Sequence, residues 1–136
     1  MRKVRTIAVV GASRDQGKEA CSVPLYLKSH GYRIVPVNPN AAEAIGEKAY
    51  PSLADIPESV ANTIDAVEVF RPSEELPKVA REVVELKKRT DRPIVFWAQL
   101  GLKNDEAKET LEANGVDHVM DACMRVVHQI NVRKAA

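Results

Sequence analysis

The sequence has few of the features that hold a chain together through cross-links or metal, or that draw it to large anionic partners. Only two of its 136 residues are cysteines, Cys21 and Cys123, and neither has the CxxC or Cys/His spacing of a zinc site. Lysine and arginine number 20 against 19 acidic residues, a formal net charge of +1. Without a broad positive field, we expect binding neither to nucleic acid nor to an anionic membrane.

Long hydrophobic runs are also absent. No segment reaches the roughly 20 apolar residues that a membrane-spanning helix needs. The basic start, MRKVRTIAVVGAS, contains too short an apolar run for a secretory signal. Aromatic residues make up only 4% of the chain, against 45% for all hydrophobic residues, which favours an aliphatic core. We therefore expect a cytoplasmic protein that forms a single domain over residues 1–136.

Apolar runs alternate with helical patterns along the whole chain. The runs predicted to be strands are Thr6–Val10, Arg33–Val37, Ala66–Phe70, Pro93–Trp97 and Val116–Met120. Helices are expected at Val23–His30, at Glu74–Arg89, from a cap at Asn104 to Asn114, and from about Met124 towards Val132. This alternation predicts an α/β fold with a Rossmann-like, doubly wound parallel sheet of five strands. The simplest strand order is 3-2-1-4-5, which opens a crevice at the carboxyl ends of strands 1 and 4.

The loop after the first strand begins like a dinucleotide-binding turn and then departs from it. In IAVVGASRDQGKEA, Gly11 is followed by Ser13 where the GxGxxG pattern has its second glycine, and Gly17 comes late. Small residues let backbone amides approach a phosphate, and the next helix directs its positive end to the same place. Ser13 adds a hydroxyl, while Arg14 and Lys18 add charge. The pattern indicates a phosphate-binding loop; the alternative is an ordinary turn with two solvated cations.

Two further strand ends carry candidate site residues. The second strand is followed by Asn38 and Pro39, where NAD-binding folds usually place an acid that accepts from the ribose hydroxyls. The missing acid argues against NAD, although the pair could equally be a stiff turn. After the third strand, Arg71 could bind phosphate oxygens through its guanidinium fork. It could equally pair with Glu74 or Glu75 at the surface.

Taken together, these strand-end segments resemble a known family. VVGAS, GYRIVPVNP, IGEKAYPSLADIP, VEVFR, VFWAQLGLKN and GVDHVMDAC occur in the order that is typical of small CoA-binding proteins. That family is similar to the amino-terminal CoA-binding domain of the succinyl-CoA synthetase α subunit. The resemblance implies a domain that holds the 3′-phospho-ADP part of coenzyme A. The implied contacts are Gly11, Ala12, Ser13, Lys18, Asn38, Pro39, Phe70 and Arg71 around the nucleotide, and Trp97 and Gln99 along the pantetheine arm.

The expected function follows from this resemblance and from the lack of a catalytic pattern. Ser13 lacks the G-x-S-x-G elbow of a nucleophilic serine, and the histidines do not cluster in the sequence. We therefore expect a module that binds CoA or acyl-CoA as its small-molecule ligand without catalysis, as a carrier, buffer or regulator. Two other classes remain open. One is a small NAD(P)-dependent oxidoreductase, and the other is a redox or storage protein that joins CoA to Cys123 or Cys21 as a mixed disulfide.

Overall fold

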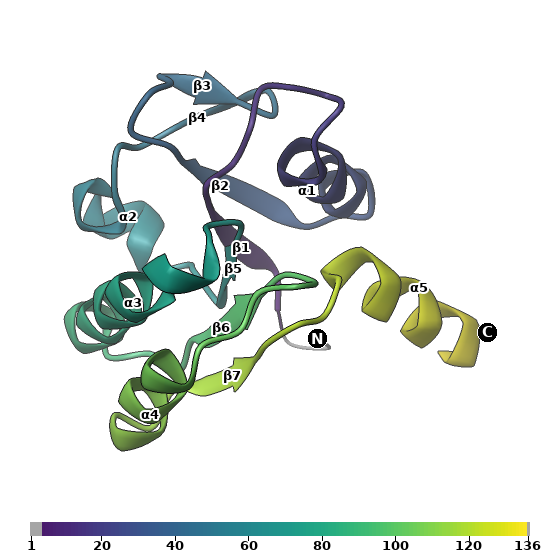
Figure 1. Cartoon of the computed structure of the whole chain (residues 1–136). Helices are drawn as coiled ribbons and strands as arrows, with labels where there is room; N and C mark the ends of the chain where they lie inside the picture. Colours follow the sequence, from purple (N-terminus) through teal and green to yellow (C-terminus); the bar gives the residue numbers. More distant parts are fainter. Residues whose placement is uncertain (1–3, 136) are drawn as a thin grey trace.

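Five parallel strands form the central sheet of the computed structural model, which describes residues 4–135 (Figure 1). The strands are β1 (Thr6–Val10), β2 (Arg33–Val37), β5 (Ala66–Val69), β6 (Val95–Ala98) and β7 (Asp117–Val119). They lie side by side in the order β2-β1-β5-β6-β7, and all of the pairs are parallel. The predicted α/β class and doubly wound parallel sheet are confirmed, and the strand ends differ from the prediction by at most two residues.

The position of the third strand differs from the simplest expectation. Counted along the chain, the observed order is 2-1-3-4-5, because β5 pairs with β1 on the side away from β2. Both orders are doubly wound and allow right-handed crossovers. Apolar patterns indicate which residues form strands, but they carry no information about which neighbour a strand takes. As a result, the connections on the two sides of the β1–β5 pair move along the sheet in opposite directions, and this pair is the switch point of the strand order. A crevice is expected there instead of at the first and fourth strands.

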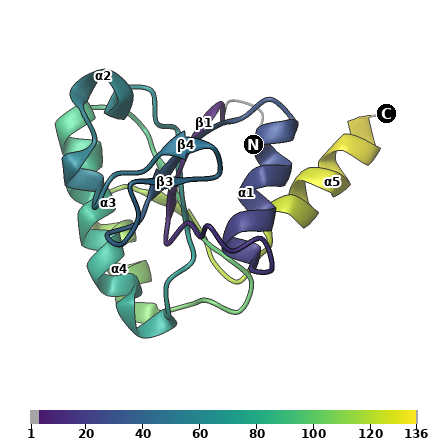
Figure 2. The same cartoon turned by 90° about the horizontal axis from the view of Figure 1, so that it is seen from above.

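Helices cover both faces of the sheet (Figures 1 and 2). One face carries α2 (Glu58–Ala61), α3 (Leu76–Thr90) and α4 (Asp105–Ala113), and the other carries α1 (Glu19–Ser29) and α5 (Met124–Ala135). This division follows from the strand order. A right-handed crossover that moves in the opposite direction along the sheet passes over the opposite face. The connection from β2 to β5 therefore brings α2 to the same side as α3.

Helix α1 begins earlier than the sequence pattern suggested. The predicted start was Val23, but the helix begins at Glu19 and contains Pro24. Proline has no amide to donate to the carbonyl four residues before it, which is that of Ala20. The backbone amide of Ser13 donates to this carbonyl instead, at 3.1 Å. The loop after β1 is thereby fastened to the first turn of α1.

Most other helix boundaries agree with the prediction, and the segment between β2 and β5 contains elements that were not predicted. Asn104 caps α4 as expected, since its Oδ1 accepts from the amide of Ala107 at 2.9 Å. Helix α3 follows a 3-10 turn, η2 (Ser73–Glu75). The unpredicted elements are a hairpin of β3 (Glu43–Ala44) and β4 (Glu47–Lys48), a 3-10 turn η1 (Leu53–Asp55), and α2. They are too short for a period in hydrophobicity to reveal them.

The sheet separates two layers of buried side chains. The layer under α3 and α4 includes the apolar side chains of Val67, Phe96 and Leu111. The layer under α1 and α5 contains Trp97 and both cysteines. Glu68 belongs to this second layer, because successive side chains along β5 point to opposite faces of the sheet.

Candidate functional site: a crevice at the carboxyl edge of the sheet

A crevice of about 440 Å³ opens at the carboxyl ends of β1, β2 and β5. It lies where the direction of the sheet reverses, and its walls come from the loops after these strands and from the start of α3. Its lining includes the following residues of the predicted site: Gly11, Ala12, Ser13, Lys18, Asn38, Pro39, Phe70 and Arg71. The structure therefore brings together the residues that were predicted around the nucleotide.

Gly11 closes the floor of the crevice. Its φ is +86°, and a Cβ at this position would lie 2.6 Å from the carbonyl oxygen of Phe70 and 3.0 Å from Cδ of Arg71. Only glycine fits so close an approach in this conformation. The amide of Gly11 donates to the carbonyl of Val37 at 3.0 Å, which joins the ends of β1 and β2. The three strand ends are therefore drawn together at one residue.

The loop after β1 offers fewer free donors than its sequence suggested. The amides of Gly11 and Ser13 already have acceptors within the protein. In contrast, the amides of Ala12 and Ala20, both in the lining, donate no hydrogen bond within residues 4–135. Ala20 lies in the first turn of α1, where amides lack intrahelical acceptors and the helix dipole is positive. An anion in the crevice would therefore meet Ala12 and the end of α1.

Asn38 braces the two loops that form one side of the crevice. Its Nδ2 donates to the carbonyl of Ala12 at 2.8 Å, and its Oδ1 accepts from the amide of Asn40 at 2.7 Å. Its own amide donates to the carbonyl of Tyr50 at 2.9 Å. Both polar atoms of the side chain are occupied, so Asn38 is placed to shape the crevice.

Charged side chains of both signs line the opposite wall. Nη2 of Arg71 lies 3.0 Å from both carboxylate oxygens of Glu75, and the two side chains are 42% and 39% exposed. Arg71 thus pairs with Glu75, which was the alternative to phosphate binding, but the pair lies in the lining of the crevice. An exposed pair of this kind contributes little to stability. The other charged residues in the lining are Lys18, Lys78 and Glu82.

Three residues of the predicted site lie outside this lining: Arg14, Trp97 and Gln99. Trp97 is buried and donates from Nε1 to the carbonyl of Ala122 at 2.8 Å. Gln99 is also buried, and its Oε1 accepts from the amide of Met124 at 3.3 Å. Both belong to the β6 segment, one strand beyond the reversal point between β1 and β5. The observed strand order therefore separates them from the crevice.

Neither cysteine lines the crevice. Cys21 lies within α1 and is 3% exposed, and Cys123 directly precedes α5 and is 8% exposed. Burial raises the pKa of the Cys21 thiol, and the nearby Asp15 carboxylate raises it further. A raised pKa disfavours the thiolate that disulfide exchange requires. This geometry does not favour the mixed-disulfide alternative at Cys21.

Sequence reasoning missed one wall of the crevice. It comes from the segment around η1 and from the exposed edge of α3, and consists of Pro51, Ser52, Leu53, Lys78, Val79 and Glu82. Lys78 and Glu82 flank the buried positions Val79 and Val83 along the helix, which reads as an ordinary solvated face. This face becomes a wall of the crevice only because η1 lies next to it. The pattern of residues along the helix does not predict that contact.

Two other kinds of site are not found in the part of the chain that the structure describes. No group of three or more His, Cys, Asp or Glu side chains is placed to hold a metal ion there. No helix among these residues is long and apolar enough to cross a membrane.

Comparison with known proteins decides the family. Residues 5–129 match the family model described as "CoA binding domain". The chain belongs to this family. The resemblance to CoA-binding proteins that was inferred from the strand-end motifs is thereby confirmed.

Proteins similar to this CoA-binding domain include the uncharacterized protein YneT of Bacillus subtilis (strain 168). It is 43% identical over 130 residues, which cover 96% of this chain and 90% of YneT. ADP-forming acetate–CoA ligase II of Archaeoglobus fulgidus is 41% identical over 80 residues, which cover 57% of this chain but only 11% of the ligase. The similarity to the ligase therefore concerns a small part of a much longer protein.

Solved structures with the same fold are known from other organisms. A Thermus thermophilus protein superposes with a TM-score of 0.83 and 37% identity, over 94% of this chain and 90% of that chain. A protein of Pyrococcus horikoshii OT3 gives a TM-score of 0.78 and 35% identity, over 94% and 84%. These likenesses cover nearly the whole sheet and its helices.

Proposed function

We propose that this chain binds coenzyme A or an acyl-CoA through its 3′-phospho-ADP part, in the crevice between β1, β2 and β5. The observation that carries the proposal is the composition of the crevice at the point where the strand order reverses, between β1 and β5. There, the unoccupied amides of Ala12 and Ala20 lie in one lining with the cations Lys18, Arg71 and Lys78. Amides at a helix start bind the diphosphate, and guanidinium and ammonium groups add charge-assisted hydrogen bonds.

We also propose that the role is binding without catalysis, as a carrier, buffer or regulator of the CoA pool. The lining side chains that carry charge or hydrogen-bonding groups are the kinds that hold phosphate and ribose. Among these lining residues, no serine or cysteine is hydrogen-bonded to a histidine. The family match supports the ligand, and the chemistry of the crevice supports a module that holds this ligand and releases it unchanged.

Ligand preference is the decisive test. Thermal unfolding is followed with CoA, acetyl-CoA, dephospho-CoA, NAD and NADP at equal concentrations. A ligand that binds only the folded state stabilises it by about 2.7 kcal/mol at one hundred times its Kd. We expect CoA and acetyl-CoA to raise Tm by several degrees and by similar amounts, because recognition is at the nucleotide end. A larger shift with NAD or NADP would overturn the proposal in favour of a nicotinamide-dependent oxidoreductase.

A pair of variants tests the location of the site. Arg71→Ala removes a guanidinium in the crevice, whereas Arg81→Ala removes one from the exposed side of α3, where it lies 3.8 Å from Glu106. We expect Arg71→Ala to weaken CoA binding about tenfold, as for the loss of one charge-assisted hydrogen bond. Arg81→Ala should leave the affinity unchanged. Equal affinities of both variants and the wild type by calorimetry would exclude Arg71 from the site.

A further inference from the structure

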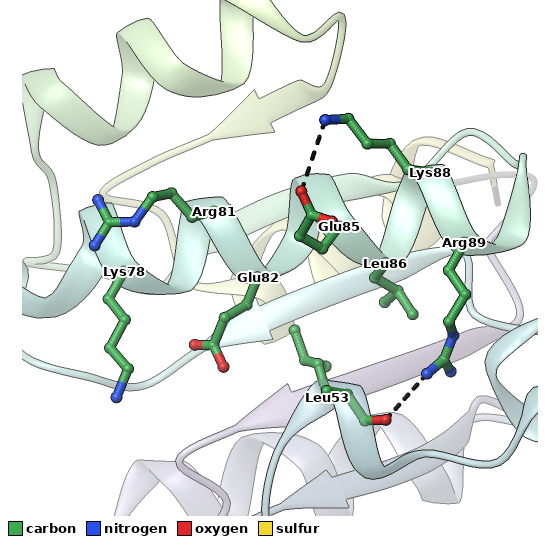
Figure 3. Close-up of a pocket in the computed structure, with 9 residues that line it drawn as sticks. Leu53, Lys78, Arg81, Glu82, Glu85, Leu86, Lys88 and Arg89 are labelled. Atoms are coloured by element: carbon green, nitrogen blue, oxygen red, sulfur yellow. Dashed lines mark hydrogen bonds and ion pairs between the residues drawn. The ribbon is translucent and has the colours of Figure 1, made fainter.

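A second hollow of about 660 Å³ runs along α3 beside the crevice (Figure 3). Its apolar lining residues are Leu53, Ala54 and Leu86, and charged side chains of α3 surround them. Leu53, Lys78 and Glu82 line this groove and the crevice alike. The two hollows therefore adjoin at these three residues, and a ligand that fills the crevice reaches α3 there.

Lys78 differs from the other cations along this wall. Arg89 donates to two backbone carbonyls of the η1 segment, at 3.1 and 2.7 Å. Arg81 and Lys88 lie 3.8 and 3.6 Å from glutamate oxygens, and Arg71 is bound by Glu75. Lys78 is exposed and has no ion pair or hydrogen bond within the described residues. Along the part of α3 that lines the groove and the crevice, here called the α3 wall, Lys78 is therefore the cation whose charged group is available to bind an anion.

Coenzyme A requires two anion sites, because it carries a diphosphate and a separate phosphate on the ribose 3′-oxygen. The amides of Ala12 and Ala20 suit the diphosphate, and Lys18 lies on that side at the N-cap of α1. We place the adenosine between this loop and Lys78, over Leu53 and Val79, which are 2% and 4% exposed and offer it only a small apolar contact. A nucleotide placed in this way carries its second phosphate to the α3 wall.

We propose that Lys78 binds the ribose 3′-phosphate and makes the crevice prefer CoA to dephospho-CoA. This inference rests on the proposed function. Glu82 lies one turn after Lys78, and both side chains extend from α3 to the same side (Figure 3). A carboxylate at Glu82 repels a phosphate bound beside it, and so it limits the preference.

Calorimetric titration with CoA and with dephospho-CoA tests this assignment. For the wild type, we expect CoA to bind about five- to tenfold more tightly, as for one partly exposed charge-assisted contact. In Lys78→Met this ratio should fall to about one, because affinity for CoA drops while that for dephospho-CoA is retained. Lys88→Met is the matched control on the same helix, away from the junction, and should keep the wild-type ratio. Glu82→Gln should raise the ratio by removing the repulsion.

The outcomes separate this inference from the proposed function. If Lys78→Met keeps the wild-type preference, or if the wild type binds CoA without any preference, Lys78 does not read the 3′-phosphate. If the wild type binds neither ligand, the proposed function fails and this inference fails with it. An unchanged Tm of ligand-free Lys78→Met checks that the exposed substitution leaves the fold intact.

Discussion

The two faces of the sheet hold different kinds of interior. Among the described residues, the buried polar side chains Glu68 and Gln99 lie in the layer under α1 and α5 together with both cysteines, whereas the face under α3 and α4 holds only Thr6. Both carboxyl oxygens of Glu68 and Nε2 of Gln99 are buried without a hydrogen-bond partner among the described residues. An unpaired buried polar group lowers the free energy of unfolding. The face under α3 and α4 therefore stabilises the fold more than the face under α1 and α5 does.

Glu68 is the extreme case of this contrast. It is fully buried in the middle of β5, with Val9 and Trp97 as its neighbours on the adjoining strands. Burial raises the pKa of Glu68 to about 8, because the charged form loses its hydration. The carboxyl is therefore mostly protonated at neutral pH, and the sheet avoids burying a charge.

The largest effect is expected on the apolar face. Phe96 is fully buried and is the largest fully buried side chain among the residues that the structure describes. Phe96→Ala should lower the free energy of unfolding by about 3–5 kcal/mol, through lost burial and the cavity that remains. Urea denaturation of the variant and the wild type measures this difference. A loss below about 1 kcal/mol would mean that this face does not dominate stability.

The next effect belongs to Glu68 and depends on pH. The unfolded carboxyl loses its proton near pH 4.5, but the folded one keeps it to about pH 8. Between these values the unfolded state binds fewer protons, so stability falls as the pH rises, by up to about 1.4 kcal/mol per pH unit. We expect a loss of about 3 kcal/mol between pH 5 and 7.5. Glu68→Gln should remove this dependence, and equal slopes for both proteins in urea titrations would contradict it.

The smallest effect is expected at the contact between α1 and α5. The hydroxyl of Tyr26 and Nδ1 of His128 lie 2.8 Å apart, and the His30 ring lies beside both. Burial lowers the pKa of His128, and the nearby His30 lowers it further. Tyr26→Phe removes this hydrogen bond and should lower the free energy of unfolding by about 0.5–1.5 kcal/mol, by urea denaturation. A loss as large as that of Phe96→Ala would show that the two faces are equally stabilising.

Most strands and the α4 cap could be predicted from the sequence, because they depend on local patterns. Runs of valine and isoleucine mark the strands, and Asn104 caps its own helix. The order of the strands could not be predicted in this way, because it depends on the long and irregular connection between β2 and β5. Trp97 and Gln99 were assigned to the ligand from a resemblance, and the same strand order places them outside the crevice.

Other parts of the site depend on contacts that are distant in the sequence. Gly11 was singled out by its loop, but the reason for glycine is the carbonyl of Phe70. Lys78 reads as solvated helix surface until η1 approaches it. Glu68 could have been recognised from the sequence as an unusual buried residue, because a carboxyl within an apolar run such as AVEVF is rare in a buried strand.

Pro24 has a consequence for the timing of motions around the ligand. Its missing amide leaves the Ala20 carbonyl to Ser13, so the amide hydrogen of Ser13 exchanges with solvent only when the loop releases the first turn of α1. The loop and the helix start therefore open as one unit. A ligand that holds this loop at Ala12 and Ala20 therefore slows hydrogen exchange of the Ser13 amide as well, and this amide reports occupancy although its own acceptor lies within the protein.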